Sequence, residues 1–276
     1  AGRAWAPIGD VTTTMLWIGG QVTTFPIIWQ LIIPSLVCVA LPLVWVSLTL
    51  KMQAPTADRV IEKKPVSESQ RTQRNLVFLL GVFCLLLVPV FKAITGLPPF
   101  IGMIFSLGVL WVATEFFHRK SNQNDREAHS VVRALQRIDM STILFFLGIL
   151  LSVTALESAG LLSQLGVLLE NRIGTITSIV FSIGLLSAVI DNVPLVSAAM
   201  KMYPLSHFPA NHHFWTFLSY CAGTGGSVLI IGSAAGVAAM GMAKIDFFWY
   251  LKKIAPLALL GYCAGAIAYM LQNKMI

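Results

Sequence analysis

The stretch LLSAVIDNVPLVSAAM, residues 185–200, places Asp191, Asn192 and Pro194 in the middle of an apolar run. Asp and Asn are favoured just before a helix, and proline suits a first helical turn because its missing N–H is not needed there. The stretch therefore predicts that one helix ends near Asp191 and that a second descends from Pro194. We expect a helical hairpin over residues 173–203.

The composition identifies the solvent around this hairpin as lipid. Hydrophobic residues make up 56% of the chain, charged residues only 11%, and the mean hydropathy is +0.77. A soluble domain of this length carries roughly 25% charged residues. We therefore expect an all-α polytopic membrane protein in contact with the lipid bilayer.

Six apolar runs have the length of about 20 residues that a helix needs to cross ~30 Å of hydrocarbon. They cover residues 25–50, 75–93, 98–117, 141–158, 213–243 and 247–271. Two further apolar pieces do not fit this rule, because 8–20 is too short and 173–203 is broken in its middle. A broken backbone at membrane depth is tolerated only where protein or a water-filled cavity surrounds it. The hairpin therefore lines a site.

Basic residues between the apolar runs predict the orientation. Segment 51–74 carries six Lys or Arg residues and segment 118–140 carries five. Loops enriched in Lys and Arg face the cytoplasm, so both segments are expected there. The formal net charge of +7 is explained by these loops, and we expect no nucleic-acid partner.

A weak internal repeat supports a transporter. Shifting the sequence by 223 residues aligns residues 2–17 with residues 225–240, with three identities, and transporters often consist of inverted repeats. We expect residues 1–50 to be the end of a first repeat, 51–74 a cytoplasmic linker and 75–276 the second repeat. The partner of the Asp191 hairpin is then expected before residue 1.

The tip of the predicted hairpin carries oxygen ligands. Its rising helix ends with free carbonyls and partial negative charge, and its descending helix begins with free N–H groups. Ser187, Asp191 and Asn192 lie at this turn. Such oxygen atoms suit a small hard cation.

A second broken element is predicted at CAGTGGSVLIIGSAAGVAAMG, residues 221–241. Its many glycines disfavour a continuous helix by about 1 kcal/mol each relative to alanine, so we expect an unwound crossing beside the hairpin tip. Close helix packing through small residues is the alternative explanation. The candidate hydroxyl ligands are Thr224, Ser227 and Ser233, and the candidate backbone positions are Gly225, Gly226 and Gly232.

The opening stretch GDVTTTMLW also carries candidate site residues, which are Gly9, Asp10, Thr12 and Thr13. Asp10 either caps a short helix or binds a cation, and these roles are compatible. Burial disfavours a charged carboxylate, whereas a bound cation favours it. A proton and a cation then compete for one group, which is a sufficient basis for exchange transport.

These three motifs resemble the NhaD-type sodium/proton antiporters of the ion transporter superfamily, and the resemblance runs along nearly the whole chain. It implies an inverted-repeat fold with re-entrant hairpins and interrupted helices, and a homodimer in the bacterial inner membrane. It also implies exchange of Na⁺ or Li⁺ for H⁺ without a cofactor, with Na⁺ held by Asp191, Asn192 and Asp10. By motif match the functional set further includes Ser187, Thr12, Thr13, Ser227 and Ser233.

Two other functions were weighed against this one. Relatives in the same superfamily carry citrate, dicarboxylates or arsenite, so a carboxylate or anion transporter is the alternative, although Asp191 would repel an anion. An intramembrane aspartyl protease would need Asp10 and Asp191 to share one proton, and the repeat does not pair them. We therefore expect no enzyme.

Overall fold

The computed structural model describes residues 4–49, 68–118, 140–230 and 245–274, together with the isolated positions 136, 236, 240 and 241. It forms two compact units, one of residues 1–51 and 144–276 and one of residues 52–143. Within the described residues the secondary structure is helical and includes no β-strand, which confirms the all-α prediction. Most of the two basic segments, and also Gly232 and Ser233, lie outside the described residues.

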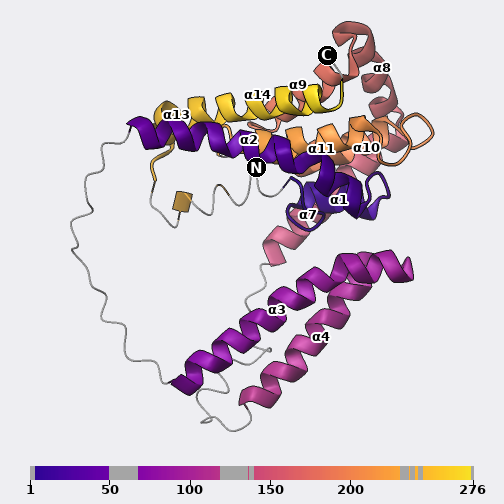
Figure 1. Cartoon of the computed structure of the whole chain (residues 1–276). Coiled ribbons are helices and arrows are strands. Elements are labelled where there is room, and N and C mark those ends of the chain that lie inside the picture. The colour runs from indigo at the N-terminus through magenta and orange to yellow at the C-terminus, as the bar shows by residue number, and fades with distance from the viewer. Residues whose placement is uncertain are drawn as a thin grey trace. The chain divides into compact units, whose positions relative to one another are not determined.

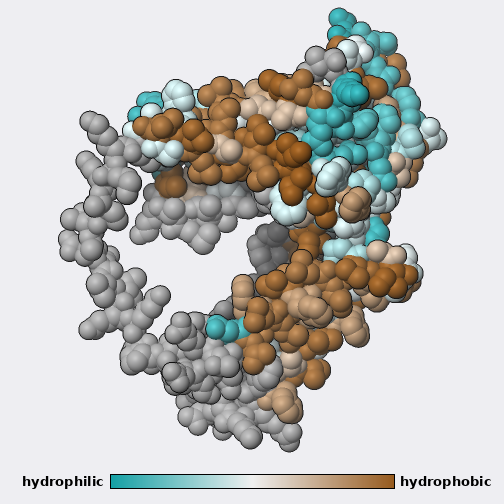
Figure 2. Space-filling view, viewed as in Figure 1, coloured by the Kyte–Doolittle hydropathy of each residue, from teal (hydrophilic) through white to brown (hydrophobic). Residues whose placement is uncertain are grey.

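The smaller unit is a pair of helices, α3 (Glu68–Thr95) and α4 (Pro99–His118). Gly96 turns the chain between them with a positive φ of 69°, and the Ser106 hydroxyl on α4 donates to the Cys84 carbonyl on α3 at 3.2 Å. Residues 75–95 and 99–116 are long and apolar enough to cross a membrane. Figure 2 shows the hydrophobic residues that cover this pair. The apolar runs 75–93 and 98–117 are therefore helices of the length expected for crossings.

In the larger unit, α2 (Thr24–Thr49) and α14 (Ala255–Gln272) lie side by side (Figure 1). Glycines allow this approach, because a Cβ atom at Gly265 would lie 2.6 Å from the Pro34 carbonyl oxygen. Both helices qualify as membrane spans. Phe25 and Trp29 on α2 remain 75% and 69% exposed, as expected of side chains that face lipid.

The predicted hairpin is present as α9 (Ile176–Leu186) and α10 (Asn192–Met202). The rising helix tightens at its end, because the N–H groups of Ala188 and Val189 bond to carbonyls three residues earlier instead of four. The descending helix begins at Asn192, two residues before the expected Pro194, and Pro194 lies in its first turn.

The two other short elements are also helices that stop inside apolar sequence. Helix α1 covers only Val11–Ile18, and α11 covers His213–Gly225. Beyond α11 the N–H groups of Ser227 and Val228 bond three residues back, and Ile230 has a φ of 60°. A β-branched residue rarely adopts this left-handed conformation. Helix α11 thus ends at Gly225, within the predicted crossing 213–243, most of whose second half lies outside the described residues.

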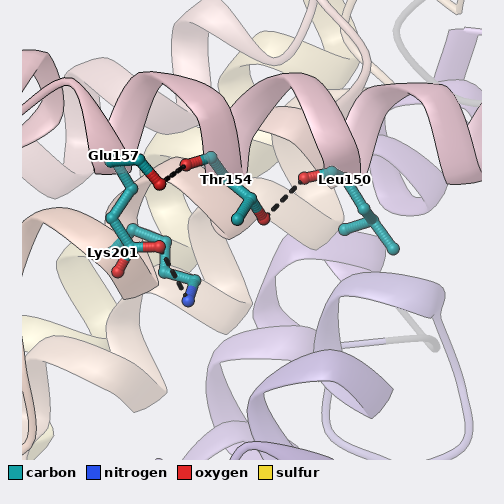
Figure 3. A network of polar contacts seen from close by, with 5 residues as sticks. Leu150, Thr154, Glu157 and Lys201 are labelled. Carbon is teal, nitrogen blue, oxygen red and sulfur yellow. Dashed lines mark hydrogen bonds and ion pairs between the residues drawn. The ribbon is translucent and has the colours of Figure 1, made fainter.

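Helix α7 (Met140–Ser158) is followed by α8 (Leu161–Ile173), which is bent by 77° from it. Helix α8 was not expected from the sequence. Gly160, with a φ of 71°, turns the chain between the two helices. Glu157 lies near the end of α7, one turn after Thr154. It forms an ion pair with Lys201 on α10 at 2.9 Å (Figure 3). This ion pair connects α10 of the hairpin to α7.

The last apolar run contains two helices where one crossing was expected. Helix α13 covers Phe247–Lys253 and α14 begins at Ala255, with Ile254 between them and proline in the first turn of α14. Among the described residues, four helices could cross a membrane by length and composition, or five if α7 and α8 count as one broken span. The division into two repeats remains a prediction.

Candidate functional site

The N-terminal ends of α1 and α10 meet through the Asp10 carboxylate. The Asn192 side-chain amide donates to Asp10 Oδ2 at 3.0 Å, and the Thr12 hydroxyl donates to the same oxygen at 2.9 Å. Asn192 and Thr12 are buried, whereas Asp10 is partly exposed. Two candidate motifs that lie far apart in the sequence therefore form one cluster.

Neither acidic residue of this cluster caps its helix through its side chain. Asp10 is the N-cap residue of α1 and Asp191 is that of α10, but neither side chain makes a capping hydrogen bond. Capping therefore does not account for the contacts of Asp10. A helix N-terminus carries partial positive charge, and each of the two acids lies at such an end.

Helix α11 forms a third side of the cluster. A Cβ atom at Gly223 would lie 3.8 Å from Asp10 Oδ2 and 3.4 Å from the Ala4 side chain. These are ordinary contact distances, so the bare backbone of Gly223 lies next to the carboxylate. The glycine-rich stretch and the GDVTTT stretch thus adjoin at Asp10.

Ser187 joins the end of α9 to α11. Its buried hydroxyl donates to the Gly184 carbonyl at 2.7 Å and to the Ala222 carbonyl at 3.3 Å. At the same crossing, a Cβ atom at Gly225 would overlap the Gly184 carbonyl oxygen. Gly225 is therefore needed for the close approach of the hairpin to α11.

Two of the predicted hydroxyl ligands also make contacts within the protein. The Thr13 and Ser219 hydroxyls lie 3.0 Å apart and join α1 to α11, and Ser219 also contacts the Ala4 carbonyl at 3.2 Å. Thr224 donates to the Tyr220 carbonyl at 2.6 Å. Ser219 was not among the predicted residues, although a serine three residues after Thr216 in an apolar run was a visible signal in the sequence.

The other predicted positions that the structure describes lie at the turn before α1 and at the end of α11. Gly9 closes the turn before α1, because its N–H bonds to the Ala6 carbonyl at 2.9 Å. Gly226 is the C-cap residue of α11, and Ser227 follows it in a half-buried position. The described residues include no group of three His, Cys, Asp or Glu side chains that could hold a metal ion. Carboxylate, hydroxyl and amide oxygens suit a hard cation instead of a soft one.

Comparison with known proteins places this arrangement in a family. The family model described as citrate transporter matches residues 1–217. The chain belongs to this family. It is 50% identical to "Sodium/proton antiporter 1" of Arabidopsis thaliana over the whole chain and 47% of that protein. It is 45% identical to "Sodium/proton antiporter 2" of the same plant, over 98% of the chain and 64% of that protein.

A bacterial relative is "Na(+)/H(+) antiporter NhaD" of Vibrio cholerae, which is 33% identical over 99% of the chain and 59% of that protein. The chain thus spans about half to two thirds of the length of these three relatives. No solved structure matches it. The resemblance to NhaD-type antiporters is confirmed, and the chain is an integral membrane protein of a transporter family, not an enzyme.

Proposed function

We propose that this citrate transporter family member exchanges Na⁺ or Li⁺ for H⁺, with the cation bound where α1 and α10 meet. The observation that carries the proposal is the contact of Asn192 with the Asp10 carboxylate at 3.0 Å. It joins the ends of two short helices in a chain that is otherwise built from apolar spans. The names of the plant and bacterial relatives state sodium and protons, which supports these two ions.

The exchange follows from competition for the two carboxylates of Asp10 and Asp191. Burial disfavours the charged form of a carboxylate, and a bound cation favours it. Each acid therefore holds either a proton or a share of a cation. A site that is open first to one side of the membrane and then to the other couples the two fluxes.

The surrounding residues have separate roles in this mechanism. Asn192 and Thr12 orient Asp10 through their hydrogen bonds. Thr13 and Ser187 hold α1 and the hairpin against α11, so a role as direct cation ligands would need a second set of contacts. Further oxygen ligands are proposed at Thr224, in the last turn of α11, and at Ser227 and Ser233, which follow the helix in the sequence.

A carboxylate transporter is the second candidate, because the family description names citrate. Two helix N-termini meet at this cluster, and such ends attract anions. Here, however, each end already has an aspartate as its N-cap residue. The negative charge that the helix ends favour is thus supplied by the protein, and a second anion would be repelled.

The same proposal includes an orientation and an assembly. If the protein lies in the bacterial inner membrane, segments 51–74 and 118–140 face the cytoplasm. In a plant membrane they face the corresponding inner side. We propose a homodimer whose only other partners are lipid, the transported cation and protons. No cofactor takes part.

The test is transport in everted membrane vesicles that carry a pH-sensitive dye. The 276-residue chain is tested alone and as a chimera that replaces the matching segment of the Arabidopsis antiporter. Asp191→Asn is compared with Asp246→Asn as a matched control, because Asp246 caps α13 through its side chain at 3.0 Å and asparagine also caps.

We expect Na⁺ or Li⁺ to collapse the proton gradient in the wild type and in Asp246→Asn, and not in Asp191→Asn. If the wild-type chimera ignores both cations and instead takes up labelled citrate, the carboxylate alternative replaces the proposal.

A further inference from the structure

The unwound segment after α11 receives a hydrogen bond from a tyrosine outside the predicted site. The Tyr250 hydroxyl on α13 donates to the Ser227 carbonyl at 2.6 Å. Asp246 begins α13 by accepting a hydrogen bond from the Trp249 N–H at 3.0 Å, and this cap fixes the first turn of the helix that carries Tyr250. The contact joins two elements that are separated by residues 231–246 of the chain.

The backbone of Ser227 is held on both sides of its Cα atom. Because α11 ends at Gly225, the Ser227 carbonyl lies beyond the helix and needs a donor from elsewhere. Tyr250 supplies one. The Ser227 N–H donates to the Thr224 carbonyl at 3.1 Å. With both peptide groups restrained, the direction of the Ser227 side chain is restrained as well.

The segment also carries backbone strain that its surroundings must hold in place. Ile230 has a φ of 60° and is only 6% exposed. Such a conformation persists only where neighbouring contacts determine it, and it gathers at functional sites. The hydrogen bond from Tyr250 reaches the chain at Ser227, three residues before this position.

We propose that Tyr250 is a positioning residue of the transport site, which acts through Ser227. This inference rests on the proposed function, since it assumes that Ser227 helps to bind the cation. Without the hydroxyl of Tyr250, the Ser227 peptide can rotate and its side chain leaves the geometry that the cation needs. Binding of the cation weakens, whereas the movement of the loaded site across the membrane does not change.

The experiment compares Tyr250→Phe with Tyr203→Phe in the same chimera and vesicle assay. Each substitution removes one phenolic oxygen. The Tyr203 hydroxyl is buried and has no hydrogen-bond partner among the described residues, so its removal costs no hydrogen bond. The half-saturating Na⁺ concentration and the maximal rate per amount of folded protein are measured for both.

We expect Tyr250→Phe to raise the half-saturating Na⁺ concentration about five- to tenfold, the usual effect of one lost hydrogen bond, with the maximal rate within about a factor of two. Tyr203→Phe should match the wild type. A double variant with Ser227→Ala should be no weaker than Ser227→Ala alone, because both changes remove the same contribution.

Three results would overturn the inference while leaving the proposed function intact. In the first, the half-saturating Na⁺ concentration of Tyr250→Phe stays at the wild-type value. In the second, only its maximal rate falls. In the third, the variant does not reach the membrane in folded form, and the Tyr250 hydroxyl is then a structural group. A wild type that exchanges neither Na⁺ nor Li⁺ overturns the proposed function, and the role of Tyr250 with it.

Discussion

Asn192 and Asp10 are 182 residues apart in the sequence, and the side-chain amide of the first donates to the carboxylate of the second at 3.0 Å. The two residues begin different half-helices, since Asp10 precedes α1 and Asn192 opens α10. One hydrogen bond therefore links the hairpin to the first interrupted helix. Any movement that separates these helices must break it.

Removing the amide of Asn192 should weaken cation binding more than it weakens folding. A hydrogen bond to a charged group contributes about 1.5–3 kcal/mol, so we expect Asn192→Ala to raise the half-saturating Na⁺ concentration about tenfold or more. Asn192→Asp replaces the donor by a third carboxylate beside Asp10 and Asp191 and should be worse. The vesicle assay measures both. Wild-type Na⁺ dependence in Asn192→Ala would show that this contact does not orient the binding carboxylate.

Two glycines of α11 should respond differently to the same added methyl group. A Cβ atom at Gly225 would lie 2.7 Å from the Ser187 hydroxyl and would overlap the Gly184 carbonyl. Overpacking of this kind costs about 1–3 kcal/mol, so Gly225→Ala should lower the yield and the thermal stability of the detergent-solubilised protein.

Gly223→Ala is the matched change, because its methyl group meets only atoms at 3.4 Å or more. It should fold normally. Its methyl group nevertheless lies 3.8 Å from Asp10 Oδ2, where it narrows the space beside the carboxylate. We expect the ratio of Li⁺ to Na⁺ activity to rise, since Li⁺ is the smaller ion. Equal stability of the two variants would contradict the close packing at Gly225.

The broken elements could be predicted from the sequence because Asp191, Pro194 and the glycine-rich stretch are rare inside apolar runs. That Asp10 and Asn192 come together could be expected only from the resemblance, since spacing along the chain says nothing of contacts between distant helices. Helix α8 was missed because its polar residues, such as Glu170 and Asn171, hide the apolar pattern. The ion pair of Lys201 and Glu157 joins α10 to α7, and no local sequence pattern reveals a contact between separate helices.

The turn between α10 and α11 depends on Asn211. Its φ is 63°, its side-chain oxygen accepts from the Thr23 N–H at 2.7 Å and from the Thr23 hydroxyl at 3.0 Å, and its own N–H donates to the Gln21 carbonyl at 2.8 Å. Asparagine tolerates the left-handed conformation better than most residues do. Asn211 therefore connects the turn before α2 to the turn before α11 through hydrogen bonds.

Three substitutions separate the two contributions of Asn211. Asn211→Asp keeps the acceptor and should stay close to the wild type in thermal stability. Asn211→Gly keeps the backbone conformation but loses the side-chain hydrogen bonds, at about 1 kcal/mol. Asn211→Ala loses both and should be the least stable, by about 2 kcal/mol. If the alanine variant were as stable as the glycine variant, the positive φ would carry no cost.

His212 should make the stability of this turn depend on pH. It lies in the connection between α10 and α11, and its ring nitrogen Nδ1 caps α11 by accepting from the Phe214 N–H at 3.2 Å. Partial burial lowers the pKa of His212 below its usual 6.5, and the neighbouring His213 and His207 lower it further. A protonated Nδ1 cannot accept, so protonation also removes the cap.

The sign of the pH effect follows from this lowered pKa. Between the folded and the usual pKa the unfolded chain binds more protons than the folded one, so stability rises with pH in that window. We expect the unfolding temperature of the wild type to be level above about pH 7 and to fall as the pH is lowered from about 6.5. His212→Asn keeps an N-cap without a titrating group and should lose most of this slope. The measurement is thermal unfolding of both proteins from pH 5 to pH 8, and parallel curves would assign the slope to other groups.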